Sequence, residues 1–188
     1  MQSVTAPISR TDIAAWPAIV DPRLRALLRY WLDLRGRRAT PDRGDFDPAN
    51  TPSLLGCFWI IKREAETGRY RFALAGEEIR NLLGRRVAGE YVDDLFVYRA
   101  RQFNDALETV TNTPAVHHLN GRMYRSGTHW IQAERLALPM SDGETVDTVF
   151  GATVYEWPAF SLGTAAKFSG DAVPTVVPVD MLASRASQ

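Results

Sequence analysis

The chain has 188 residues, and its 22 Lys and Arg side chains balance 22 Asp and Glu side chains, giving a formal net charge of zero. This balance provides no electrostatic reason to expect binding to nucleic acid or to an anionic membrane surface. A single cysteine, Cys57, excludes disulfides within the chain and a cysteine-based zinc site. The first twenty residues contain no continuous apolar segment, and no stretch is apolar for long enough to span a bilayer. We therefore expect a soluble, cytoplasmic protein with one domain.

The N-terminal region is predicted to be a loosely held arm over residues 1–21, followed by a helix over 22–35. Asp21 can cap the first turn with its side chain, and Pro22 suits the first helical position. Apolar residues repeat at helical spacing along one side of this helix, so it should form only when packed on a sheet face or, in a homodimer, on another chain. This stripe consists of Leu24, Leu27, Leu28 and Trp31.

The loop over 37–52 contains three aspartates, Asp42, Asp45 and Asp47. Their spacing does not match a calcium-binding loop, and turns in which each side chain accepts from a nearby backbone amide explain them better. Two strands are predicted next, over 54–62 and 70–75, which a polar turn should join into an antiparallel hairpin.

The pattern then becomes helical. Short helices are predicted over 77–83 and 91–96, and a longer one over 98–111 presents a regular apolar side. A third strand is predicted over 115–123, after Pro114. The middle of the chain should therefore consist of small helices inserted between strands.

Two long strands, over 128–138 and 145–157, are predicted to form the hairpin around which the domain is organised. Asp142-Gly143 can supply the turn between them. The second strand carries apolar residues in both of its alternating phases, so we expect it to be covered on both faces and to lie centrally in its sheet. The first strand is expected to be covered less completely.

The domain itself is predicted to occupy residues 22–160. Beyond it the composition turns to Gly, Ser, Ala, Pro and Val without clear periodicity. We predict a flexible tail over 161–188, within which the valine-rich segment 173–179 could dock.

The predicted order of elements resembles that of a PAS domain, and the resemblance covers about residues 22–157. Short helical turns that end in glycines, over 76–91, are similar to the middle of that family's fold. Further short motifs are similar to a bacterial single-domain PAS subgroup once catalogued as a domain of unknown function. These are Tyr30-Trp31, Asp45-Phe46-Asp47-Pro48, Arg71-Phe72, Ala75-Gly76, Glu134-Arg135-Leu136 and Leu138-Pro139.

The resemblance implies an α+β fold with a five-stranded antiparallel sheet in the order 2-1-5-4-3. Short helices would cover one face of this sheet, and the N-terminal helix would pack on the outer face or on a partner. A ligand pocket would lie between the sheet and the helix that bears Phe103. The candidate lining residues are Trp59, Phe72, Leu74, Phe96, Phe103, Leu107, His118 and Trp130. A filled hydrophobic core explains the same apolar set equally well.

The cofactors known in this family find no matching residues. The resemblance would place a haem-binding histidine on the helix over 98–111, which contains none, and a flavin-reactive cysteine among the helices, whereas Cys57 lies in the first strand. A metal site is also not expected, because His117 and His118 are neighbours on a strand and point to opposite faces. His118 could instead supply one polar group to the pocket.

No catalytic arrangement is visible in the sequence. Glu134 and Arg135 are neighbours on a strand and face apart, and the chain lacks a nucleophile elbow or a phosphate-binding loop. We expect a sensory or regulatory module that binds a small ligand, a protein partner or both, and that dimerises through the helix over 22–35. The alternatives are a ligand-free scaffold with a filled core and a small α+β enzyme.

Overall fold

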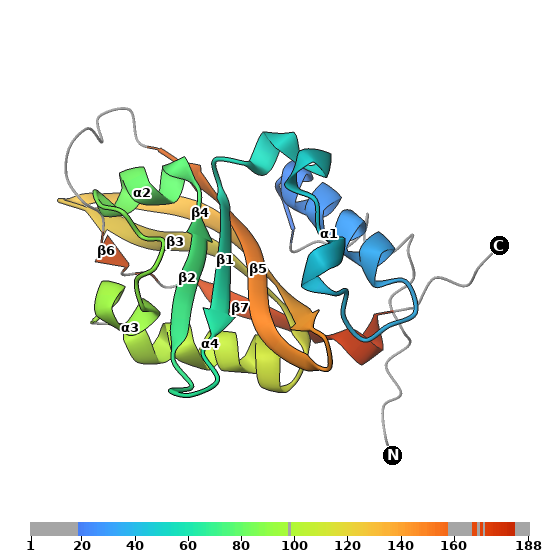
Figure 1. Cartoon of the computed structure of the whole chain (residues 1–188). Coiled ribbons are helices and arrows are strands. Elements are labelled where there is room, and N and C mark those ends of the chain that lie inside the picture. The colour runs from blue at the N-terminus through green and yellow to red at the C-terminus, as the bar shows by residue number, and fades with distance from the viewer. Residues whose placement is uncertain (1–18, 98, 158–166, 169, 171, 183–188) are drawn as a thin grey trace, which may run out of the picture.

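The computed structural model describes residues 19–97, 99–157, 167, 168, 170 and 172–182 (Figure 1). One antiparallel sheet separates helix α1 from the three other helices. The helices are α1 (Pro22–Arg35), α2 (Glu77–Leu83), α3 (Val92–Leu95) and α4 (Ala100–Asn112). The strands are β1 (Phe58–Arg63), β2 (Tyr70–Ala75), β3 (Ala115–Ser126), β4 (His129–Asp142), β5 (Thr145–Glu156), β6 (Lys167–Phe168) and β7 (Val173–Pro178).

The sheet contains the predicted strand order β2-β1-β5-β4-β3, with neighbouring strands antiparallel. Five strands were too few, however. Both β6 and β7 pair with β3, so the sheet continues beyond the expected edge. The prediction of an α+β fold with an antiparallel sheet and short helices is confirmed, with this extension.

Strand β7 corrects the predicted tail over 161–188. It pairs with β3 along its whole length, with Val176 opposite His117, and Val179 then donates its amide to the carbonyl of Pro114 at 2.9 Å. The valine-rich segment therefore docks as part of the sheet. Residues 158–166 and 183–188 lie outside the described part of the chain.

The start of the domain also differs from the predicted boundary at residue 22. Ile19 is only 1% exposed and belongs to the core beneath α1, so the described end of the predicted arm is part of the fold. Residues 1–18 lie outside the described residues.

The sheet has a hydrophobic core on each face. The inner core lies against α2, α3 and α4 and includes Trp59, Phe72 and Phe103, whereas the outer core lies against α1 and includes Leu136 and Phe150. Strand β5 has β1 on one side and β4 on the other, which confirms its predicted central position. Strand β4 is buried on both faces from residue 133 to 140, but His129, Trp130 and Gln132 at its start are exposed, in agreement with the less complete cover that was expected for it.

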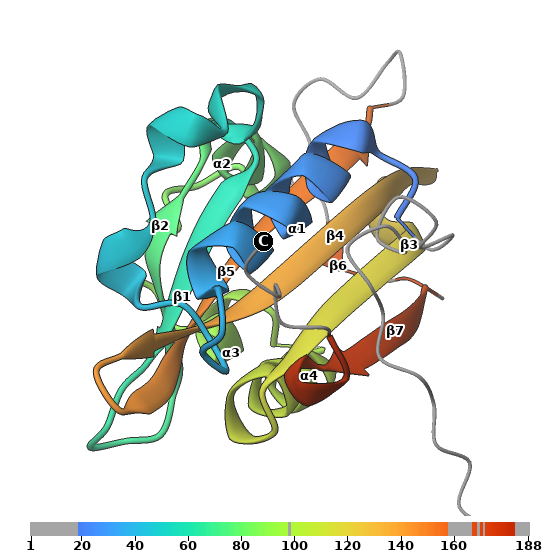
Figure 2. The same ribbon diagram turned by 90° about the vertical axis from the view of Figure 1, so that its right-hand side faces the viewer.

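Helix α1 lies across the outer face of the sheet (Figure 2). Its first turn is capped as predicted, because the Asp21 side chain accepts a hydrogen bond from the backbone amide of Arg23 at 2.7 Å. The apolar stripe Leu24, Leu27, Leu28 and Trp31 is buried against the chain's own sheet. These four residues are therefore not available as the dimer or partner interface that we predicted for them.

Several boundaries moved for local reasons. Residues 52–54 form a 3-10 turn, so β1 begins at Phe58 rather than at Leu54. In the preceding loop the aspartates act as turn residues, as predicted: Asp42 accepts from the amide of Gly44, and Asp47 from that of Ala49, both at 2.9 Å.

The packing of α1 predicts the effect of truncating Leu28. The Leu28→Ala variant should lose about 2–5 kcal/mol of unfolding free energy, because the side chain is fully buried in the outer core. Urea denaturation measures this loss, and Arg29→Ala, on the exposed side of the same helix, should change it by about 0.5 kcal/mol or less. A Leu28→Ala protein of unchanged stability and reduced oligomeric state would contradict this packing and favour an interface between chains.

Candidate functional site

The interior between the sheet and the helices is almost completely filled. The predicted pocket residues Trp59, Phe72, Phe96, Phe103 and Leu107 do come together there, in the inner core. The rings of Phe96 and Phe103 stack with their centroids 4.8 Å apart. The space that remains beside them is about 10 Å³, which is roughly the volume that one water molecule needs.

Close packing of Trp59 on the sheet explains part of this filling. Its ring lies against Gly151, where a Cβ atom would collide with the indole and lie 2.7 Å from the carbonyl oxygen of Leu136. The indole Nε1 donates to Thr153 Oγ1 at 3.0 Å. The central strand therefore carries glycine where the aromatic ring needs its space.

Arg135 occupies the centre of the same interior. Its Nε donates to Thr153 Oγ1 at 3.3 Å, its Nη2 donates to the hydroxyl of Tyr124, and the guanidinium lies 4.6 Å from the centroid of Phe103. A buried cation needs such partners, because leaving it without them is costly. The Arg135 guanidinium and the side chains that contact it thus take up space that a ligand in the interior would need.

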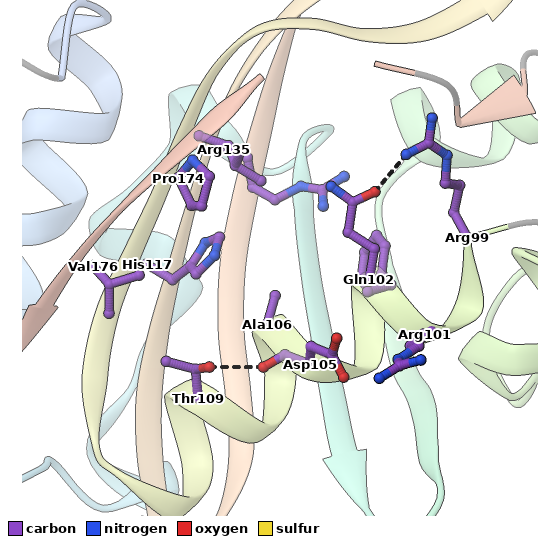
Figure 3. A pocket seen from close by; sticks show the side chains of 12 residues that line it. Arg99, Arg101, Gln102, Asp105, Ala106, Thr109, His117, Arg135, Pro174 and Val176 are labelled. Carbon is purple, nitrogen blue, oxygen red and sulfur yellow. Dashed lines mark hydrogen bonds between the residues drawn. The ribbon is translucent and has the colours of Figure 1, made fainter. Parts of the chain in front are cut away.

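A much larger cavity, of about 480 Å³, lies on another side of α4 (Figure 3). We call it the α4–β7 groove. Helix α4 forms one wall, β3 and Arg135 of β4 form the base, and β7 forms the opposite wall. Its lining comprises Arg99, Arg101, Gln102, Phe103, Asp105, Ala106, Thr109, His117, Leu119, Arg135, Pro174 and Val176.

The lining includes one histidine, His117, whose side chain is buried, with an exposed fraction of 5%. Among the described residues no hydrogen-bond partner is found for its ring. Burial, with the nearby positive charge of Arg135, lowers the pKa of His117 to about 4, so the imidazole is neutral at pH 7. The described buried side-chain atoms without a partner do not include the His117 ring nitrogens, so water or a ligand in the groove can reach the ring.

The mouth of the groove is rich in positive charge. Arg99 is the N-cap residue of α4 and Arg101 lies in its first turn, and neither forms an ion pair with the residues that the structure describes. Arg99 Nη1 donates to the side-chain amide oxygen of Gln102 at 2.9 Å, which leaves its charge without a carboxylate. Asp105 is the one acidic side chain of the lining.

His118 lies on the opposite face of the sheet, so its prediction as a pocket residue was wrong. Its Nε2 lies 2.8 Å from Glu134 Oε1, beneath α1. Glu134 also accepts from the backbone amides of Val20, at 2.7 Å, and Asp21, at 2.6 Å. Burial alone would raise the pKa of Glu134, but the hydrogen bonds from His118 and from the two amides lower it below its ordinary value. Glu134 thus ties the start of α1 to the sheet.

Two further predicted pocket residues are absent from the interior. Leu74 is 42% exposed on the edge strand β2, because a bulge pairs Leu74 with Ile60 and Phe72 with Ile61, which breaks the simple alternation of faces. Trp130 is 38% exposed, and the guanidinium groups of Arg122 and Arg125 lie 5.7 and 5.9 Å from its ring centroid.

The groove consists mostly of residues that sequence reasoning missed. Alternation along β3 does show that His117 and His118 face apart, as predicted, but not which of them faces α4. Arg99, Gln102, Ala106 and Thr109 repeat at helical spacing, and this pattern could have shown that they share one side of α4 and its N-cap. Nothing local indicated that β7 would lie opposite.

The elements and their order can be compared with known families. A model of the PAS domain matches residues 20–154, which is most of the chain. The chain belongs to the PAS domain family. Comparison with curated proteins and with solved structures finds no significant match. Membership of this family indicates a sensory or regulatory module, and such domains are generally non-catalytic.

Two further findings concern the described helices and the extent of the family match. None of its described helices combines the length and the apolar composition needed to cross a bilayer. Its matched region ends before β7, so one wall of the α4–β7 groove lies outside the part that the family model covers.

Loss of the Glu134 carboxylate should loosen α1. The Glu134→Ala variant is expected to lose about 3 kcal/mol of unfolding free energy, because it leaves two backbone amides and His118 without their buried acceptor. Urea denaturation at pH 7 measures the loss, and Glu144→Ala, at an exposed turn, is the control. Equal stability of the two variants would show that the carboxylate does not hold this junction.

Acid should destabilise the domain through His117. Since its pKa is about 4 in the folded chain and its ordinary value is 6.5, the unfolded chain binds more protons between these values. Stability should therefore fall as the pH decreases from 6.5 to 4, by roughly 3 kcal/mol in total from this group.

The His117→Gln variant, which cannot titrate, should lack this part of the acid dependence. Urea denaturation at several pH values between 7 and 4 measures it. His129→Gln, at the exposed start of β4, should keep the full dependence. Glu134, whose lowered pKa makes stability fall as the pH drops below about 4.5, contributes equally to all three proteins. Parallel stability curves for wild type and His117→Gln would refute the buried neutral imidazole.

Proposed function

We propose that this PAS domain is a non-catalytic regulatory module that binds a small ligand in the α4–β7 groove and passes the signal on by contact with another protein. The contrast between the two cavities carries the proposal: about 480 Å³ in the groove against about 10 Å³ in the interior. Small-molecule sites in proteins usually occupy some 300–1,000 Å³. The groove falls in that range and the interior does not.

The lining of the groove supports recognition rather than bond making. It contains no serine or cysteine among its described residues, and its one threonine hydroxyl, that of Thr109, donates to the carbonyl of Asp105 at 2.7 Å. His117, with a pKa of about 4, is a weak base at neutral pH. These features speak against the third hypothesis, a small α+β enzyme.

The structure also offers little to the cofactors considered for the family. An interior space of about 10 Å³ is small for a haem or flavin ring, which supports a proposal without either. The described residues of α4 include no histidine, and Cys57 lies in the outer core, where burial and the nearby Glu78 carboxylate raise the pKa of its thiol to about 12. A non-covalent small metabolite suits the groove better.

A ligand-free scaffold is the second candidate, and the filled interior favours it. In that case the exposed surface alone would matter, and a protein partner or a second copy would bind there. The apolar stripe of α1 would not take part, since it is buried.

Native mass spectrometry of protein purified from cells, followed by thermal-shift assays with a metabolite panel, distinguishes the candidates. We expect a bound small molecule or a stabilising metabolite. Ala106→Trp, which puts a large ring into the groove, should abolish the effect. Glu108→Trp, on the exposed side of the same helix, should retain it.

Absence of any bound mass and of any thermal shift would replace the sensor by the scaffold. A ligand that survives Ala106→Trp but is lost when the interior is altered by Phe96→Trp would place the site in the interior and contradict the groove.

A further inference from the structure

We infer that the α4–β7 groove selects a small organic anion, with an apolar body and one anionic group, and this inference rests on the proposed function. From the sequence, His117 and Arg135 were considered for other roles, and neither Arg99 nor Arg101 was placed at a site. The argument uses the charge balance of the groove, the unpartnered imidazole and the apolar surface beside them.

The charge balance favours an anion. Three guanidinium groups, those of Arg99, Arg101 and Arg135, line the groove with a single carboxylate, that of Asp105. Arg99 and Arg101 form no ion pair with described residues, and they lie where α4 begins. A carboxylate or phosphate group can receive paired hydrogen bonds from such guanidinium groups.

The imidazole of His117 gives the groove a polar group deep inside. Its exposed fraction is 5%, and it has no hydrogen-bond partner among the described residues. Figure 3 shows its ring between β3 and α4, on the same side as Arg135 and Gln102. The lowered pKa of His117 has the charge of Arg135 among its causes, which reflects the positive potential at this position.

The remaining lining sets the body of the ligand. Phe103, Ala106, Leu119, Pro174 and Val176 provide apolar surface from three different elements. A fully polar ion such as citrate would leave this surface uncovered, whereas a molecule with a ring or a short alkyl chain would cover it. The ligand class that satisfies all three conditions is an aromatic or aliphatic acid or phosphate monoester.

Isothermal titration calorimetry with four probes of one shape tests the inference. Phenylacetate and phenyl phosphate carry an anionic group, 2-phenylacetamide is neutral and 2-phenylethylamine is cationic. We expect at least one anion to bind about tenfold or more tightly than the neutral and cationic probes. Phenylacetate and phenyl phosphate together show which anionic group is preferred. Raised salt should weaken the binding of the anions, because Arg101 is exposed.

Paired variants test whether these arginines are responsible. Arg99→Gln with Arg101→Gln should weaken the preferred anion about tenfold and leave 2-phenylacetamide unchanged. Arg80→Gln with Arg86→Gln changes the net charge equally at exposed positions outside the groove, and should alter neither affinity. Equal losses in both double variants would reduce the effect to overall charge and overturn the inference.

The outcomes separate this inference from the proposed function. Tighter binding of the neutral or cationic probe, with loss in Ala106→Trp, would overturn the anion and leave the groove as the ligand site. If no probe binds, the small molecule that copurifies with the wild-type protein and is lost in Ala106→Trp provides the test. An anionic molecule would support the inference, and a neutral or cationic one would refute it. If no probe binds and no small molecule copurifies with the protein, both the inference and the proposed ligand-binding function would be refuted.

Discussion

The burial of Arg135 is the constraint that decides where this PAS domain has free volume. A guanidinium removed from water must be given acceptors, and here the hydroxyls of Thr153 and Tyr124 accept from it while Phe103 packs on its face. Thr153 also accepts from the indole of Trp59. These partners converge between sheet and helices, so the interior is nearly full. The larger open volume lies instead beyond α4, where Arg135 also reaches the base of the groove.

The two faces of the sheet divide the polar residues between two tasks. Successive residues on a strand point to opposite faces, so Glu134 and Arg135 serve different cores, as do His117 and His118. The outer pair, Glu134 with His118, fixes the start of α1. The inner pair belongs to the groove. Helix α1 is therefore a cover that the sheet requires, which is why its apolar stripe is not free for a partner.

The sequence predicted the elements and the strand order well because these follow from local periodicity and turn residues. It could not predict the phase of β3 and β4, since both faces of the sheet are apolar and either histidine could have faced α4. Leu74 was misplaced because a bulge in the β1–β2 pairing changes its face. Strand β7 was read as tail because two prolines, Pro174 and Pro178, and its exposed side chains hide a strand that forms only by pairing with distant β3.

The groove joins residues that the family model matches with residues that lie beyond the match. Helix α4 and β3 lie within the matched residues 20–154, whereas Pro174 and Val176 lie beyond them on β7. Among the strands that the structure describes, β7 pairs with β3 alone, so a ladder of hydrogen bonds on one side holds this wall. A ligand that contacts both walls would stabilise the pairing of β7 by as much as that pairing increases the ligand's affinity, because linkage is reciprocal. The family match therefore covers the α4 and β3 sides of the groove, and the wall formed by β7 is the part that this match does not account for.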